Sequence, residues 1–132
     1  MPLERVTPQG LYKPTTYSQV VIATGRRLVF ISGQVSIGAD GQLVAENDFA
    51  GQARQVYANL RTALRGAGAT PADVTKLTTY VVGYTPELRG IIAEARAAVF
   101  RSGELPASTL VGVQALAEPG YLLEVEAIAV VN

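Results

Sequence analysis

Apolar residues recur at spacings of three and four between residues 49 and 65, and this period predicts an amphipathic helix. Asp48 stands before the run, where a short carboxylate can cap a helix, and Gly66 or Gly68 is expected to end it. The stripe that faces the core is expected to consist of Phe49, Ala53, Val56, Tyr57, Leu60 and Leu64.

A second helix is predicted from Pro86 to about Phe100. Proline is favoured in the first turn of a helix, because its missing N–H has no partner there in any case. Gly103 and Pro106 follow the expected end. The inward face is predicted to carry Leu88, Ile91, Ile92, Ala95 and Val99.

Short runs of β-branched and aromatic residues predict the strands. Residues 20–24 and 28–32 are two such runs, and Gly25-Arg26-Arg27 between them predicts a β-hairpin with a solvated tip. Further strands are expected at 35–37, 42–44, 75–82, 107–113 and 121–131, with turns at Asp40-Gly41 and Pro119-Gly120.

The predicted order of elements is two strands, a short strand, a helix, a strand, a helix and two strands, in one domain over residues 1–132. Two helices with about six strands predict an α+β fold, in which both helices cover one face of a mixed sheet. The other face of that sheet must be covered too. We therefore expect it to be buried against another subunit.

Composition narrows the chemistry. The charges of eleven basic and eleven acidic residues cancel, and a chain without net positive charge gives no support to a nucleic-acid partner. The chain has no cysteine and no histidine, so thiolate nucleophiles, zinc–thiolate sites and Ser-His-Asp triads are excluded. No acidic cluster has the spacing of an oxygen-ligand loop, and neither a metal ion nor a cofactor is expected. No apolar run approaches the ~20 residues of a membrane span, so we expect a cytoplasmic protein without a membrane partner.

Six short segments together resemble the YjgF/RidA (Rid) family, which is also labelled endoribonuclease L-PSP. Each match is weak alone, but their order and spacing cover nearly the whole chain. The segments are Tyr17-Ser18-Gln19, Ile31-Ser32-Gly33-Gln34, Gln52-Ala53-Arg54-Gln55 with Asn59-Leu60, residues 76–82, Pro106-Ala107 and residues 124–129.

The resemblance implies a chorismate-mutase-like fold and a barrel-like homotrimer that binds small molecules in clefts between subunits. Active members of the family hydrolyse reactive imines or enamines of 2-keto acids and release ammonia. An arginine after Pro-Ala pairs with the substrate carboxylate in those members, and a glutamate of the last strand helps to position the water.

Glu124 matches the family's last-strand glutamate and is the candidate catalytic residue. Strand alternation places it on one face with Glu126, at a separation of ~7 Å, while Val125 and its alternate neighbours point to the other face. A carboxylate on an apolar strand needs a cleft or a partner. A water-orienting acid/base and an ion pair across a subunit interface are both open for Glu124, and a structural role is favoured for Glu126.

Ser108 stands where the deaminases carry their arginine. A hydroxyl offers one neutral donor in place of a two-pronged cationic fork, which should weaken carboxylate binding by about 2–3 kcal/mol. Two further family positions differ, since Leu110 replaces a cysteine and Ala93 an asparagine. Ser108 is therefore a candidate binding residue, with an ordinary strand position as the favoured interpretation.

Tyr17, Ser32 and Gly33 complete the candidate substrate-binding residues. Tyr17 offers a hydroxyl or an aromatic wall, and Gly33 permits a close approach of backbone or ligand. Arg96 on the second helix offers a substitute cation, although an arginine on a helix surface is usually just solvated.

Three functions remain open from the sequence. The first is hydrolysis or deamination of a small imine or enamine, with Glu124 orienting water. The second is a catalytically altered or inactive family member that binds a small ligand between subunits. A ribonuclease or inhibitor of translation is the least favoured, because the chain is uncharged overall and lacks histidine.

Overall fold

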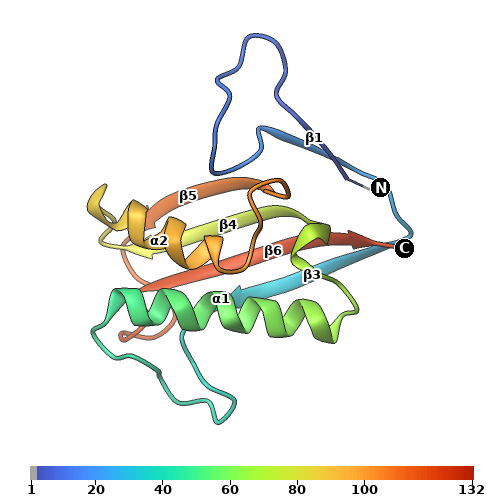
Figure 1. Cartoon of the computed structure of the whole chain (residues 1–132). Coiled ribbons are helices and arrows are strands. Elements are labelled where there is room, and N and C mark those ends of the chain that lie inside the picture. Colours follow the sequence, from blue (N-terminus) through green and yellow to red (C-terminus); the bar gives the residue numbers. More distant parts are fainter. Residues whose placement is uncertain (1–2) are drawn as a thin grey trace.

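A four-stranded mixed sheet with both helices on one of its faces forms the body of the protein (Figure 1). The computed structural model describes residues 3–132. The strand order is β3-β6-β4-β5, and only the β4–β5 pair is parallel. The elements are β1 (Leu3–Val6), β2 (Val20–Ala23), β3 (Arg27–Gln34), α1 (Phe49–Gly66), a 3₁₀ turn (Pro71–Asp73), β4 (Val74–Val82), α2 (Glu87–Ala97), β5 (Ala107–Val113) and β6 (Leu123–Val131). The α+β class and the placement of both helices are thereby confirmed.

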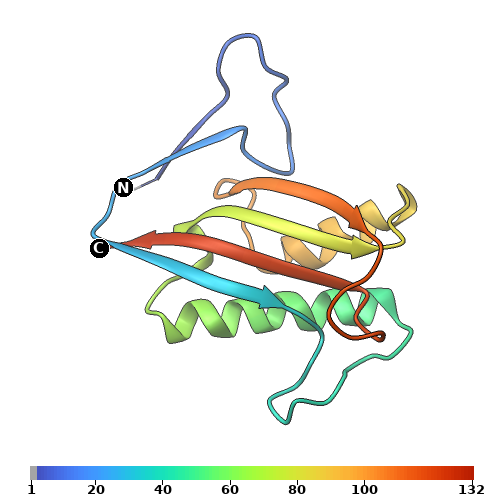
Figure 2. The ribbon, with the colours of Figure 1, turned by 180° about the vertical axis from the view of Figure 1, so that it is seen from behind.

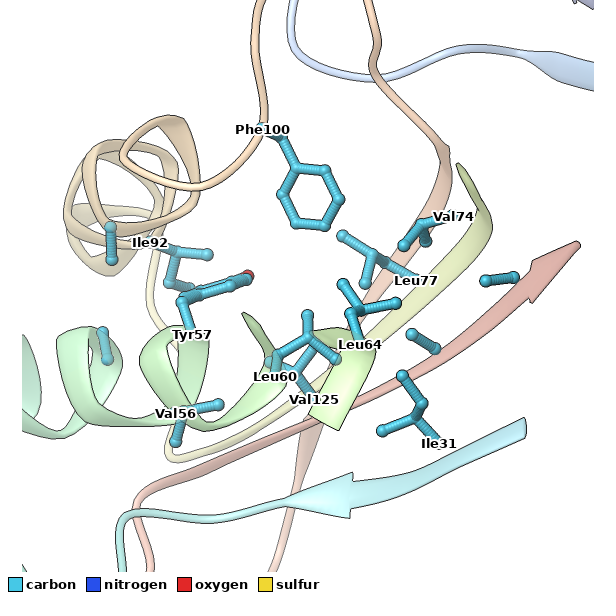
Figure 3. Packing of buried hydrophobic residues seen from close by; sticks show 14 of the residues in the cluster. Ile31, Val56, Tyr57, Leu60, Leu64, Val74, Leu77, Ile92, Phe100 and Val125 are labelled. Carbon is cyan, nitrogen blue, oxygen red and sulfur yellow. The ribbon is translucent and has the colours of Figure 1, made fainter. Parts of the chain in front are cut away.

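The core lies between α1 and the sheet. The apolar stripe of α1 is buried as its spacing predicts, and Figure 3 shows Tyr57 and Leu60 of α1 facing Leu77 of β4 and Val125 of β6. Asp48 caps the helix, because its carboxylate accepts the Gly51 N–H at 3.0 Å. Helix α2 lies beside α1 on the same face and covers the β4–β5 side of the sheet (Figure 1).

The predicted hairpin of residues 20–24 and 28–32 is wrong. Strand β2 pairs instead with β1, and β3 pairs with β6. β3 must bury Ile31 on the helix-covered face, and β6 offers it a long antiparallel partner. Gly25 serves a close approach to the end of β6, since a Cβ there would meet Val130 and the Val131 carbonyl.

Two smaller expectations also change. The strands expected at 35–37 and 42–44 reduce to the single bridge Ile37–Leu43 around the Asp40-Gly41 turn, where Gly41 has a φ of +82°. Helix α2 ends at Ala97, before the expected Phe100, and Ile91 points outward with 36% of its surface exposed. Its inward positions at Ile92 and Ala95 are buried as predicted.

The second face of the sheet carries no helix. Figure 2 views the sheet from that side, with both helices behind the strands. Leu28 and Phe30 of β3 are 64% and 71% exposed on it, and Val111 of β5 is 37% exposed. The single chain thus leaves large apolar side chains in water on this face.

A ribbon of β1 and β2, with the long loop between them, stands off beyond β5 (Figures 1 and 2). The base of this arm is fixed to the start of β5. Ser18 forms a parallel bridge with Ala107, and its hydroxyl donates to the Leu105 carbonyl at 2.6 Å. The Arg5 guanidinium donates to the Leu105 and Ala72 carbonyls.

One buried polar side chain ties α1 to the loops at the end of the sheet. The Gln52 amide donates to the carbonyls of Ala45 and Gly120, at 3.3 and 3.0 Å, and accepts the Leu122 N–H at 3.0 Å. Gln52 is fully buried. If its side chain were removed, no water could take its place as the hydrogen-bond partner of these backbone groups.

Substitution Gln52→Met should therefore lower the free energy of unfolding by at least ~2 kcal/mol, because a buried donor and its partners lose their hydrogen bonds. The measurement is urea denaturation at fixed protein concentration, with Gln42→Met, at an exposed turn position, as the matched control. Equal midpoints for the two variants would contradict the role given to Gln52.

Candidate functional site

The five candidate residues predicted from the sequence fall into two groups on opposite faces of the sheet, and each group has neighbours that were not expected. The first group lines a cavity of about 250 Å³ on the helix-covered face, at the outer strand β5. Its walls come from the arm, β4, α2 and β5, and consist of Thr16, Tyr17, Thr79, Arg89, Ile92, Arg96, Ser108 and Leu110.

Strand register explains why Ser108 faces this cavity. In the parallel β4–β5 pair Ser108 lies beside Leu77 and Leu110 lies beside Thr79. Leu77 is fully buried under the helices, so the same alternation turns Ser108 and Leu110 toward α2. Tyr17 joins them because the adjacent Ser18 is held to the start of β5.

The cavity is cationic and rich in hydroxyl groups. Arg89 and Arg96 lie seven residues apart on α2 and line the same wall, since seven residues are about two helical turns. Four hydroxyl side chains face them, and no aspartate or glutamate is among the lining residues. Arg96 is half-buried, whereas Arg89 is exposed.

The Tyr57 hydroxyl lies close to the Thr79 and Arg96 side chains. It is buried and has no hydrogen-bond partner among residues 3–132. Burial raises the pKa of the Tyr57 hydroxyl, while the Thr79 side chain and the charge of Arg96 offset part of that rise. Thr79 and Arg96, which both act on Tyr57, are themselves lining residues of the cavity.

The second group lies on the face of the sheet that has no helix. Glu124 of β6 points to that face, opposite the buried Leu123 and Val125, and is half-buried. The pairing of β3 with β6 shifts register between Ile31 and Gln34, which is a bulge at Ser32 and Gly33.

Gly33 is small because Glu124 lies against it. A Cβ at position 33 would overlap the Glu124 carboxylate and the end of its side chain. The close approach expected at Gly33 is therefore made by a carboxylate of the neighbouring strand. Ser32 is exposed next to it, and its carbonyl accepts the Gln34 side-chain amide at 3.0 Å.

A tyrosine that sequence reasoning missed joins this group. Tyr80 of β4 lies opposite Glu124 in the β4–β6 register. Desolvation, the neighbouring Glu126 carboxylate and then the charge of Glu124 raise the pKa of the Tyr80 hydroxyl. Both carboxylates and the phenol thus share one patch, on the face that also exposes Phe30.

Within one chain the two groups do not meet. β4 lies between β5 and β6, and Ser108 and Glu124 point to opposite faces of the sheet. Arg26 and Arg27 are exposed at the start of β3, at the other end of that strand from Ser32 and Gly33, and do not line the cavity. Arg89 was missed altogether, although its spacing from Ala93 and Arg96 on one helix face was visible in the sequence.

Residues 3–132 contain no group of three or more acidic side chains that would hold a metal ion. Over the same part of the chain, no helix combines the length and the apolar character that crossing a membrane requires.

Comparison with known proteins gives consistent matches. The sequence family described as Endoribonuclease L-PSP matches residues 8–131. The RutC family protein YjgH of Escherichia coli is 34% identical over 127 residues, which are 94% of this chain and 92% of that protein. The RutC family protein PH0854 of Pyrococcus horikoshii is 33% identical over 86% of this chain and 85% of its own length.

Solved structures agree. The crystal structure of YyfB from Yersinia pestis, described as a protein of unknown function of the conserved Rid family, is 40% identical. It superimposes with a TM-score of 0.93 over 99% of this chain and 100% of that one.

Substitution Gly33→Ala should displace the Glu124 carboxylate while leaving the fold intact, because the overlapping atoms end a flexible side chain. We expect the free energy of unfolding to change by less than ~1 kcal/mol. A crystal structure of the variant should show Glu124 in another rotamer. An unmoved Glu124 with a shifted β3 backbone would contradict this account of the glycine.

Proposed function

The chain belongs to the YjgF/RidA (Rid) family described as endoribonuclease L-PSP, and from that premise we propose that it hydrolyses small reactive imines or enamines in clefts between subunits. The observation that carries the proposal is the division of the candidate residues between two faces of one sheet. Glu124 lies on one face and the cavity at Ser108 on the other, so a complete site needs a second copy of the chain.

The exposed apolar side chains support that assembly. Burying a phenylalanine or leucine side chain contributes about 1.5–3 kcal/mol, and Phe30 and Leu28 lie mostly in water in the single chain. The arm adds Tyr12 and Leu11, which are 73% and 51% exposed. A closed homotrimer would bury this face of every subunit and leave no open end.

Such an assembly gives each cleft two complementary halves. One subunit contributes the arginines and hydroxyls of the cavity beside β5, and its neighbour contributes Glu124 with Gly33. The cationic half suits an anionic group of the ligand, and the carboxylate half suits the reacting carbon and its water.

The proposed chemistry needs only water and proton transfer. Glu124 accepts a proton as water adds to the C=N carbon and returns it to the nitrogen, which gives a neutral tetrahedral carbinolamine. Glu124 then relays the hydroxyl proton to the nitrogen, the C–N bond breaks, and ammonia leaves as the C=O bond of the ketone forms. Tyr80 lies opposite Glu124 in the β4–β6 pair, and the charge of Glu124 contributes to the raised pKa of the Tyr80 hydroxyl.

A binding function without turnover is the second candidate. Ser108 and Leu110 make the wall of the cavity beside β5 less polar than that expected of a deaminase, and Ala93 on α2 adds no polar group. In this second function the protein would bind a ligand of the same size in the same cleft but would not accelerate its hydrolysis.

The direct test generates 2-aminoacrylate in situ and follows the loss of its imine form. We expect the protein to accelerate hydrolysis, and Glu124→Gln to lose about 10²–10⁴-fold of the rate because the proton acceptor is gone. Glu46→Gln, in an exposed loop, is the matched control and should keep the rate. If the wild type does not accelerate hydrolysis over buffer, the hydrolase function is wrong and the binding function replaces it. If Glu124→Gln keeps full activity, Glu124 has no part in the mechanism.

A further inference from the structure

The residues that line the cavity beside β5 include positive charges and no negative charge. Two arginines of α2 line it, and its other lining residues are hydroxyl-bearing or apolar. Building on the cleft proposed above, we propose that Arg96, assisted by Arg89, binds the carboxylate of a small anionic ligand. The cation that Ser108 cannot supply from β5 is thus supplied from the helix that faces it.

Burial distinguishes Arg96 from an ordinary surface arginine. Its side chain is half-buried, and its charge acts on the hydroxyl of the fully buried Tyr57. A guanidinium held partly out of water loses hydration, and an anion compensates for that loss. The exposed Arg89 lies at the same wall, where it favours the approach of negative charge.

The small residue on β5 makes this arrangement possible. Ser108 leaves the space between β5 and α2 open, and its hydroxyl can donate to one oxygen of a carboxylate whose other oxygen meets Arg96. Thr79 and Tyr17 add hydroxyls to the same cavity. A bulky apolar side chain at position 108 would fill this space without offering a donor.

Size and lining define the ligand class. A volume of about 250 Å³ is smaller than the sites that hold drug-sized molecules, so the ligand has only a few heavy atoms. Ile92 and Leu110 provide an apolar wall for a short carbon chain. These features favour a small aliphatic carboxylate over inorganic phosphate, which has no apolar part.

The experiment measures the binding of pyruvate by isothermal titration calorimetry, with pyruvamide as the uncharged counterpart and inorganic phosphate as the competing anion. Wild-type protein should bind pyruvate more tightly than either, and added salt should weaken that binding. Substitution Arg96→Met should weaken it about 10- to 100-fold through loss of a charge-assisted contact. Arg65→Met, at the exposed end of α1, is the matched control and should bind as the wild type does.

A rescue variant separates charge from structure. Adding Ser108→Arg to Arg96→Met returns a cation to the same cavity from the opposite wall, and pyruvate binding should recover. If Arg96→Met lowers the unfolding midpoint, Arg96→Gln replaces it, with the same result expected. Absence of pyruvate binding by the wild type, equal affinity for pyruvate and pyruvamide, or unchanged affinity in the Arg96 variants would each overturn the inference.

The binding measurement does not require the protein to be an active enzyme, so it can fail or succeed separately from the proposed hydrolysis. Pyruvate binding through Arg96 without imine hydrolysis contradicts the proposed function alone. If the protein hydrolyses imines but its affinity for pyruvate is the same in the Arg96 variants as in the wild type, this inference alone is contradicted.

Discussion

The two-residue alternation of β6 determines how the rest of the protein is organised. One set of its side chains, Leu123, Val125, Ala127 and Ala129, is buried under α1 and forms the centre of the core. The other set carries Glu124 and Glu126 to the face without helices. Because β6 pairs with both β3 and β4, a change of its register would move the core and the carboxylates together.

This arrangement places the core and the candidate catalytic residue on opposite faces of one strand. The buried face secures the position of the backbone, and the bulge at Gly33 adapts β3 to the Glu124 side chain. On the opposite layer, the parallel β4–β5 pair and α2 form a cavity whose charge comes from the helix. Each half is well formed in a single chain, yet neither has the groups of the other.

Elements with strong local signals could be predicted from the sequence. The spacing of α1, the alternation of β6 and the extent of β5 all match the structure within a few residues. The pairing of β2 and β3 could not be predicted, because Gly25 reads as a hairpin turn although it serves a close approach to β6. Strand β1 was missed for a similar reason, since four residues paired only with β2 leave a weak pattern.

Most residues of the candidate site could be named from the sequence, but their arrangement in space could not. Glu124, Gly33, Tyr17 and Ser108 were all marked by position in the sequence, but only the sheet order shows that Glu124 and Ser108 face opposite ways. Arg89 gave no signal as a single residue, and Arg96 resembled a solvated helix position. Their significance depends on a cavity that forms only when α2 packs over β5.

The division of the site between neighbouring copies is the central claim, and subunit complementation tests it most directly. Glu124→Gln and Ser108→Phe, which fills the cavity, should each inactivate the homogeneous protein. Co-expressed in equal amounts, they should regain about a quarter of the wild-type rate of imine hydrolysis, because random assembly leaves that share of clefts with both halves intact. No recovery in mixed oligomers of properly folded variants would contradict the claim, since it would place both residues in the same cleft from one chain.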